Sequence, residues 1–358
     1  MRTNNLKQLT VAMATIASLT ASVISASAND KVRVGFGTTW PTFSILQLAQ
    51  EQKLLGDVEI EITVLDTPVR GYQMMSAGQL DVVFGTLDYV PIAASSQLPI
   101  SLVSVVDISY GADEILLAPG VKPEDLKGKK VGAGQGLIGE LYMGEFLKRH
   151  GLGTGDIEWV NINPDEIVGP MVSGDVKAVY TYEPWSSKLV EALPGTQRAL
   201  NSGDKDILAS GTIADTVYMS NDFLAKHPDE AQTILRGFFD AVKARSDDTV
   251  NANDRLAEFT KWPVGDVAGL LGTTGRSAVG GMYIVDFEEA ARQCGVLEGE
   301  GPLGQANGSL PAAVNRIEDG WISRGTLKSK SVNLGSYVNC EPLKALVKSG
   351  YRSSSAAQ

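Results

Sequence analysis

The pattern that decides the fold is the segment SAGQLDVVFGTLDY, which occupies residues 76–89. The helical pattern before it runs from Pro68 to Ala77 and stops at Gly78, a residue type common at helix ends. An apolar run from Asp81 to Phe84 then predicts a strand, and a polar loop leads into a second helical pattern that begins at Tyr89. A helix, a strand and a helix in this order predict parallel strands that are covered by helices.

The same alternation extends on both sides of this segment. Strands are predicted at 32–35, 58–65 and 100–106, and a second series after Pro119 has strands at 130–132, 157–160 and 176–180. Helical patterns lie between these strands, and they dominate the chain beyond Asn221. We therefore predict two α/β units of about 90–100 residues each, followed by a helical tail of about 130 residues.

The composition excludes several classes of protein. The chain has 358 residues, 43% of them hydrophobic, and its 31 basic and 42 acidic residues give a formal net charge of −11. This apolar content is too high for a disordered chain, and the length suits two domains that each bury a core. An acidic chain without basic clusters is a poor partner for nucleic acid or an anionic membrane, so we expect neither.

The first 28 residues have the three parts of a secretory signal peptide. Arg2 and Lys7 form a positive start, an uncharged stretch follows from Leu9 to Ile24, and Ala26-Ser27-Ala28 is a small-residue cleavage site. The apolar stretch is too short and too rich in Ser and Thr for a membrane anchor. We therefore expect export to the periplasm, with cleavage near Ala28.

Two cysteines are present, Cys294 and Cys340. In an oxidising compartment they can form a disulfide that closes a loop of about 47 residues and stabilises the fold by roughly 3–4 kcal/mol. Two buried free thiols fit the sequence nearly as well, because the spacing along the chain does not set the distance between the sulfur atoms. Neither cysteine lies near the predicted cleavage site, so lipid attachment there is not expected.

The sequence has few residues of the kinds that catalyse reactions. The two histidines, His150 and His227, both lie at predicted helix ends. No His pair or Cys-x-x-Cys has the spacing of a zinc site, and neither a Gly-x-Ser-x-Gly elbow nor a phosphate-binding loop is present. The glycines from Gly132 to Gly136 follow a strand but lack the dinucleotide fingerprint. We expect no enzymatic activity, no metal site and no cofactor.

Polar and aromatic residues gather in the loops after the predicted strands. In an open α/β sheet, loops of this kind form the crevice in which ligands bind. The candidate ligand-binding residues are Trp40, Thr42, Asp88, Tyr89, Tyr110, Gln135, Gly136, Glu183, Trp185 and Asp215. We expect them to face one shared cleft between the two units.

Four segments match one family of proteins in their order and spacing. They are Val34-Gly35 with Trp40-Pro41, residues 76–83, residues 121–132 and residues 176–185. Together they resemble the substrate-binding proteins of ABC importers in the nitrate/sulfonate/taurine family. The resemblance covers roughly residues 31–245 and leaves the pairing of the helices in the tail open.

The resemblance implies a two-lobed periplasmic-binding-protein fold, with two doubly wound α/β sheets joined by two crossing strands. Residues 1–28 are then the signal peptide, 29–112 lobe one, 113–217 lobe two, and 218–358 a return to lobe one with C-terminal helices packed on it. It further implies a monomer that closes on a small-molecule ligand and delivers it to an inner-membrane ABC permease.

Two sets of candidate residues suit opposite charges on the ligand. The loop Gly134–Gly139 precedes a helix, and its backbone N–H groups with the helix dipole can receive an anionic group. The residues suited to an ammonium group are the acids Asp88, Glu183 and Asp215 and the aromatic residues Trp40, Tyr89 and Trp185. Structural roles stay open for several of them: a tight turn at the glycines, helix starts at Asp88 and Glu183, a core position at Trp185 and a hinge anchor at Asp215.

We therefore expect a small zwitterionic or anionic ligand, with taurine or a related sulfonate as the best candidate. A betaine-like quaternary amine suits the same acids and aromatic residues, and a pyrimidine thiamin precursor suits the aromatic loops. A pyrimidine-synthase-like enzyme is a remote alternative, because such enzymes carry a Cys-rich motif with histidines that this chain lacks. A periplasmic adaptor that presents its ligand to a sensor is not distinguishable from an importer component by sequence.

Overall fold

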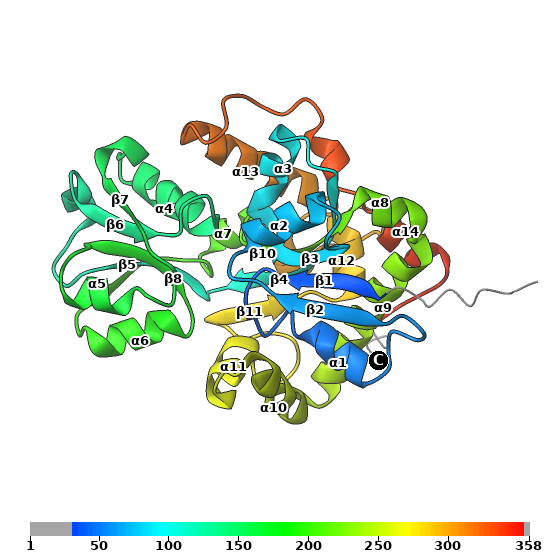
Figure 1. The fold of residues 1–358 in the computed structure, drawn as a ribbon. Coiled ribbons are helices and arrows are strands. Elements are labelled where there is room, and N and C mark those ends of the chain that lie inside the picture. The colour runs from blue at the N-terminus through cyan, green and yellow to red at the C-terminus, as the bar shows by residue number, and fades with distance from the viewer. Residues whose placement is uncertain (1–30, 354–358) are drawn as a thin grey trace, which may run out of the picture. The chain divides into compact units, whose positions relative to one another are not determined.

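The computed structural model describes residues 31–353, and the predicted signal peptide lies outside the described residues. The described chain has an α/β fold with two mixed sheets that are flanked by helices (Figure 1). The predicted fold class is confirmed. No helix within residues 31–353 is long and apolar enough to cross a membrane.

The larger sheet has six strands. In spatial order they are β11 (Gly281–Ile284), β4 (Ile100–Tyr110), β10 (Ala214–Ser220), β3 (Val82–Thr86), β1 (Val32–Phe36) and β2 (Ile60–Val64). Strand β1 runs parallel to β2 and β3, whereas β10 runs antiparallel to β3 and β4. The loops after β1 and β3 therefore leave the same edge of the sheet, where β10 begins.

The smaller sheet has five strands. In spatial order they are β7 (Glu158–Asn161), β6 (Lys130–Ala133), β8 (Ala178–Tyr182), β5 (Asp113–Leu117) and β9 (Gln197–Asn201). Strand β6 runs parallel to β7 and β8, and β5 runs antiparallel to β8 and β9. In Figure 1 this sheet lies on the left and the larger sheet on the right.

Helices accompany each sheet. Those between the strands of the larger sheet are α1 (Ile45–Glu51), α2 (Pro68–Ser76) and α3 (Val90–Ser95). Those of the smaller sheet are α4 (Ile138–Arg149), α5 (Val168–Val172), α6 (Trp185–Ala192) and α7 (Lys205–Ser210). The tail contains α8 (Asn221–Lys226), α9 (Pro228–Asp247), α10 (Thr249–Thr260), α11 (Val264–Leu271), α12 (Phe287–Gln293), α13 (Leu310–Ser323) and α14 (Glu341–Lys348).

Three strands differ from the prediction. The tail is not wholly helical, because β11 joins the larger sheet beside β4. The sequence pattern also does not predict β5 or β9, and their antiparallel pairing helps make both sheets mixed rather than parallel. Strands of four or five residues contain too few repeats for hydrophobic periodicity to separate them from loops or helices.

The tail completes the core of the larger sheet. Phe238 and Phe239 of α9 are fully buried, and Phe238 packs against Phe84 of β3 with ring centroids 5.6 Å apart. Helix α9 also packs against α1 and α14. One part of the tail reaches the other sheet as well, because α13 packs against both α3 and α4. The tail thus packs mainly, but not wholly, on the larger sheet.

The chain changes from one sheet to the other at two crossings. The first passes from β4 to β5 through Gly111, whose φ of +112° and whose closeness to Gly280 leave no room for a Cβ atom. Ser202 stabilises this turn, since its Oγ lies 2.7 Å from Ser109 Oγ and accepts a hydrogen bond from Gly111 N–H. The second crossing passes from α7 into β10. The predicted lobe boundaries remain predictions, but both crossings lie close to them.

Cys294 and Cys340 form a disulfide, with their Cα atoms 6.1 Å apart. The bond links the end of α12 to the residue that precedes α14, so it ties together two helices of the tail. Of the two alternatives that the sequence left open, the described structure therefore contains the disulfide.

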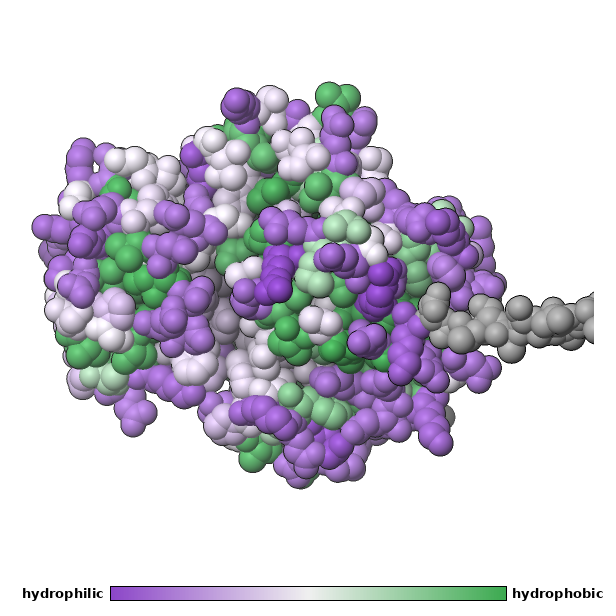
Figure 2. Space-filling model, viewed as in Figure 1, coloured by the Kyte–Doolittle hydropathy of each residue, from purple (hydrophilic) through white to green (hydrophobic). Residues whose placement is uncertain are grey.

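The surface is mostly hydrophilic on the face that Figure 2 displays, with smaller apolar areas between the polar ones. The exposed large apolar side chains are scattered valines: Val64, Val172, Val250, Val264, Val279 and Val332. Single exposed apolar residues of this kind are normal on protein surfaces and do not mark a binding site.

Candidate functional site

A cavity of about 80 Å³ lies between the two sheets, and we call it the acidic pocket. Its lining residues are Thr38, Trp40, Phe43, Pro68, Gly85, Thr86, Ser109, Asp113, Ile138, Tyr180, Tyr182, Ile213, Ala214, Asp215 and Met282. They come from the loop after β1, from the ends of β3 and β4, and from β5, β8, β10 and β11. The starts of α2 and α4 and the crossing before β10 complete the lining. A water molecule needs about 10–15 Å³ of such space, so the pocket has room for a small organic solute.

Aromatic rings form one wall of the acidic pocket. Trp40 and Tyr182 contact each other edge to face, with ring centroids 5.1 Å apart. Trp40 is only 6% exposed, and its indole N–H has no hydrogen-bond partner within the described residues. Behind Trp40, the hydroxyl of the fully buried Thr42 faces the carboxyl group of Asp107. An unpaired buried donor such as the Trp40 N–H is rare in a folded protein, so it is a candidate contact for a further group.

Carboxyl groups form the floor of the acidic pocket. Asp113 and Asp215 line it and are each 8% exposed, and Asp107 lies behind them at 0%. Strands β4 and β10 pair Asp107 with Asp215, whose backbone N–H donates to Asp107 Oδ1 at 3.3 Å. Tyr180 donates its hydroxyl to Asp113. The three carboxyl groups therefore meet at the two crossings.

Burial changes the protonation of these carboxyl groups. It raises the pKa of Asp107 to about 7 and also raises the pKa of Asp113. The pKa of Asp215 lies well above its usual value because the group is buried and because Asp107 is its neighbour. Two carboxylates this close cannot both be ionised without an opposing charge, so the pair retains a proton in the neutral range.

Two of the ten predicted site residues, Trp40 and Asp215, line the acidic pocket. Asp88 and Tyr89 are buried inside the larger-sheet part, where Trp321 donates its indole N–H to the carbonyl of Asp88. Burial raises the pKa of Asp88 to about 6. Tyr89 stacks on Tyr72 with centroids 3.8 Å apart. These two residues belong to the core around the pocket rather than to its lining.

Gln135 and Gly136, predicted to receive an anion, already have internal hydrogen-bond acceptors. Gln135 N–H donates to Asn161 Oδ1 at 2.9 Å, and Gly136 N–H donates to Glu140 Oε2 at 2.8 Å. Glu140 lies in the first turn of α4, so its own carboxylate occupies the positive end of that helix. Neither Gln135 nor Gly136 lines the acidic pocket.

Tyr110 and Glu183 also lie outside the lining. Tyr110 packs against Tyr283 of β11, with ring centroids 6.4 Å apart. Glu183 forms an ion pair with Arg198 at 3.5 Å and accepts a hydrogen bond from the hydroxyl of Ser187 at 2.8 Å. Both residues therefore have structural partners of their own.

Trp185 joins a contact between helices that accompany different sheets. Its ring faces Trp262, which lies between α10 and α11, with centroids 6.4 Å apart. Lys188 Nζ lies 4.1 Å from the centre of the Trp185 ring and forms an ion pair with Asp266 at 3.1 Å. We call these four residues the clasp. Trp262 also contacts Trp40, which connects the clasp to the acidic pocket.

Several pocket residues were missed at the level of sequence. Tyr180 and Tyr182 alternate along β8, and this spacing places both side chains on one face of the strand. That signal was available in the sequence. Asp107 lies in an apolar run and looks like an ordinary strand residue. Asp113 ends the polar segment 109–113 near the domain junction but is not among the candidate residues, and Trp262 belongs to the tail, where helices are predicted to dominate.

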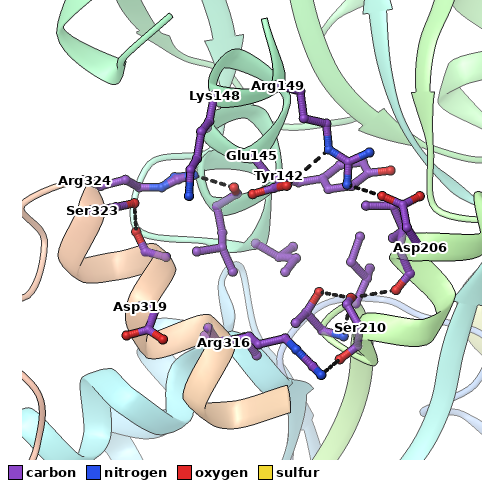
Figure 3. A pocket seen from close by; sticks show the side chains of 18 residues that line it. Tyr142, Glu145, Lys148, Arg149, Asp206, Ser210, Arg316, Asp319, Ser323 and Arg324 are labelled. Carbon is purple, nitrogen blue, oxygen red and sulfur yellow. Dashed lines mark hydrogen bonds and ion pairs between the residues drawn. The ribbon is translucent and has the colours of Figure 1, made fainter. Parts of the chain in front are cut away.

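A second and larger cavity of about 410 Å³ lies between α4, α7 and α13, and we call it the charged groove (Figure 3). Arg149 forms ion pairs with Asp206 at 2.6 Å and with Glu145 at 3.1 Å. Arg324 of α13's C-terminal end donates to the carbonyl groups of Glu140 and Leu141. Ile138 and Ile213 line both cavities and separate them. The carboxylates and arginines of the groove already have partners, so the acidic pocket is the better candidate site.

Among the described residues, no group of His, Cys, Asp and Glu side chains has an arrangement that could hold a metal ion. The buried acids of the pocket thus lie beside a space that is large enough for a small organic molecule and is lined by aromatic rings. This arrangement suits binding of a small molecule between two sheets.

A family model matches residues 25–259, which is more than half of the chain. The chain belongs to the NMT1-like family. This NMT1-like protein is 25% identical over 254 residues to the taurine-binding periplasmic protein of Escherichia coli (strain K12), a match that covers 66% of this chain and 74% of that one.

Solved structures share the fold. The periplasmic aliphatic sulphonate binding protein SsuA of Escherichia coli superposes with a TM-score of 0.67 at 16% identity, over 86% of this chain and 92% of that one. The desulfurization enzyme DSZB superposes with a TM-score of 0.60 at 16% identity, over 90% of this chain and the whole of that one. The fold of the NMT1-like protein is thus that of periplasmic binding proteins, and an enzyme also uses it.

Proposed function

We propose that this NMT1-like protein is the periplasmic solute-binding component of an ABC importer. The observation that carries the proposal is the acidic pocket, whose lining combines Trp40 from the larger-sheet part with Tyr180 and Tyr182 from the smaller-sheet part. The family membership and the taurine-binding relative support it. The partners are a small-molecule solute and an inner-membrane permease, and the protein acts as a monomer after export and removal of its signal peptide.

The proposed mechanism is closure of two lobes. Lobe one comprises residues 29–112 and the returning segment 218–358, and lobe two comprises residues 113–217. Neither lobe supplies all the contacts of the acidic pocket, so a ligand stabilises the closed arrangement by its greater affinity for it. The crossings at Gly111 and before β10 are the segments about which the lobes turn.

The proposed solute is a small zwitterion, with taurine or a related sulfonate as the leading candidate. Asp113 and Asp215 suit an ammonium group, and the aromatic wall supports the same assignment. A betaine-like quaternary amine fits these features as well, and a pyrimidine thiamin precursor is the remaining alternative. Binding rather than catalysis is proposed although DSZB shares the fold, because no His or Cys is among the described residues that line the acidic pocket.

Calorimetry on the mature protein tests the assignment. Taurine, alkanesulfonates, nitrate, glycine betaine and a hydroxymethylpyrimidine are titrated, and taurine is expected to bind at micromolar to millimolar concentration. A ligand at 100 times its dissociation constant stabilises the fold by about 2.7 kcal/mol, so a thermal shift provides a second readout. Failure of taurine to bind rejects the leading solute.

Uptake in cells tests the importer role itself. Deletion of the gene is expected to abolish concentrative uptake of the solute that calorimetry identifies, and the intact gene is expected to restore it. Unchanged uptake, together with loss of a transcriptional response to the same solute, would instead support the sensor adaptor.

A further inference from the structure

We propose that the acidic pocket binds its ligand through an ammonium group and provides no charged partner for an anionic end. The inference rests on the proposed function, because it specifies which part of a zwitterionic solute the importer component recognises. It goes further by predicting that amines without a sulfonate bind and that sulfonates without an amine do not.

The charges of the acidic pocket are all of one sign. Asp113 and Asp215 line it and Asp107 lies directly behind them, whereas none of the described residues in its lining is Lys, Arg or His. Three nearly buried carboxyl groups without a basic partner carry a high electrostatic cost. A ligand ammonium group supplies the missing positive charge. It can donate charge-assisted hydrogen bonds to Asp113 and Asp215.

An unpartnered polar atom provides a second, independent observation. The indole N–H of Trp40, a residue with 94% of its surface covered, is buried without a hydrogen-bond partner in the described chain. It is a neutral donor that suits an uncharged or weakly held acceptor on the ligand.

The aromatic wall strengthens the preference for a cation. Trp40, Tyr180 and Tyr182 all line the pocket beside the carboxyl groups. A cation over such a ring gains about 0.5–2 kcal/mol, the upper end when both are desolvated, and an anion gains nothing comparable. Tyr180 also donates its hydroxyl to Asp113, which holds that carboxylate in place within the wall.

An anionic end finds little to bind. The start of α4 reaches the pocket through Ile138, but the Glu140 carboxylate already accepts from Gly136 N–H and offsets the positive end of the helix. Helix α2 reaches the pocket through Pro68, its first residue, which has no N–H to donate. The groups that can still contact the anionic end are neutral ones, such as Thr38 and Trp40.

A matched set of solutes tests the inference on the unaltered protein. Taurine carries both charges, ethanolamine replaces its sulfonate with a hydroxyl, and ethanesulfonate lacks its amine. Calorimetry is expected to give dissociation constants for taurine and ethanolamine within about tenfold of each other, and one for ethanesulfonate at least about 100-fold weaker. Ethanesulfonate binding as tightly as taurine overturns the inference.

Variants then locate the ammonium group. Asp215→Asn and Asp113→Asn keep the size of the side chain, and each is expected to weaken ethanolamine binding by about 10–100-fold. Asp206→Asn, which alters a carboxyl group of the charged groove, is the matched control and is expected to leave binding unchanged. Affinity that is unchanged or higher in both pocket variants overturns the inference, and circular dichroism checks that they fold.

The outcomes separate this inference from the proposed function. If an uncharged pyrimidine binds and is imported while all three matched solutes fail, the ammonium assignment is wrong and the importer role stands. If no solute binds and deletion of the gene changes no uptake, the proposed function itself is wrong.

Discussion

The acidic pocket and the charged groove lie on opposite sides of Ile138 and Ile213, and they differ in whether their acidic side chains have basic partners. In the groove, the acids have basic partners: Arg149 pairs with Glu145 and Asp206, and Lys330 pairs with Asp319. In the acidic pocket, Asp113 and Asp215 have no basic side chain among the described lining residues.

This difference separates structural charges from charges that are available to a ligand. The partners in the groove also join the two sides of the molecule, since Arg324 donates to carbonyl groups of α4 and Arg316 donates to the carbonyl of Ser210 at 2.8 Å. Volume alone would favour the groove, which is the larger cavity. The lack of basic partners favours the acidic pocket instead, because buried carboxyl groups without an opposing charge need a partner.

The largest expected effect is on ligand affinity in the acidic pocket. Asp215→Ala removes one of two lining carboxylates and is expected to weaken binding of an amine ligand by about 100-fold, while the fold remains intact. Calorimetry measures the loss. Arg149→Ala in the charged groove is the comparison, and it is expected to change affinity by less than about threefold. Equal losses in both variants would remove the distinction between the two cavities.

The next effect concerns stability in the charged groove. Arg324→Ala removes two hydrogen bonds from a guanidinium group to α4 and is expected to lower the free energy of unfolding by about 2 kcal/mol. Chemical denaturation measures this change. Gly144→Ala is a related variant, because a Cβ atom there would collide with the Arg324 guanidinium group and displace it. Arg316→Ala is the milder control, since this exposed side chain makes one such bond. Full stability in Arg324→Ala would show that α13 does not hold α4.

The third effect is a dependence of affinity on pH. The groups that face Asp107 and Asp215 are Asp113 on β5, Tyr180 and Tyr182 on β8, Asp88 after β3 and the hydroxyl of Thr42. Burial raises the pKa of both tyrosines, so they stay neutral, and Asp107 has a pKa of about 7. A cation prefers the ionised pair, so affinity for an amine is expected to rise about tenfold from pH 5.5 to pH 8. Calorimetry at several pH values checks this rise, and Asp107→Asn is expected to flatten it.

Stability of the ligand-free protein has the opposite dependence. Burial raises the pKa of Asp88 to about 6 and that of Asp107 to about 7, so the native protein binds protons that the unfolded chain has already lost. The two groups make their full contribution to the free energy of unfolding below the ordinary pKa of a carboxyl group, and this contribution is lost as the pH rises through 6 to 7. The melting temperature without ligand is therefore expected to be higher at pH 5.5 than at pH 8. A melting temperature that rises over this range would contradict the assignment.

The smallest expected effect is at the clasp. Asp266→Asn breaks the ion pair with Lys188, a partly exposed contact between helices that accompany different sheets, and such pairs contribute about 0.2–1 kcal/mol. Ligand dissociation is expected to become faster by less than about fivefold, which stopped-flow fluorescence of the nearby tryptophans can follow. Trp185→Ala removes the ring contact with Trp262 as well, and is expected to have the larger effect of the two. If neither variant changes the rate of ligand dissociation, the clasp plays no part in the proposed lobe closure.

Local patterns predicted much of the fold, and two of the candidate site residues line the acidic pocket. The helix that ends at Gly78 and the strand after it appear in the structure as α2 and β3, because an amphipathic helix and a buried strand have distinct periods. Trp40 and Asp215 were predicted because each lies where a loop meets a strand end, and both line the acidic pocket. Short strands such as β9 and β11 were not predicted, since four or five residues leave the period of the hydrophobic pattern undetermined.

What the sequence determined by itself is the fold class and the kind of residue at each strand end, because both follow from contacts between near neighbours in the chain. Only the tertiary structure decided which polar groups meet. Asp107 and Asp215 are 108 residues apart in the chain yet share a hydrogen bond, and Trp262 reaches Trp40 from the tail. It also decided that Glu140 occupies the helix start that looked free for an anion. Such outcomes depend on how distant strands and helices pack, and hydrophobic periodicity does not specify that packing.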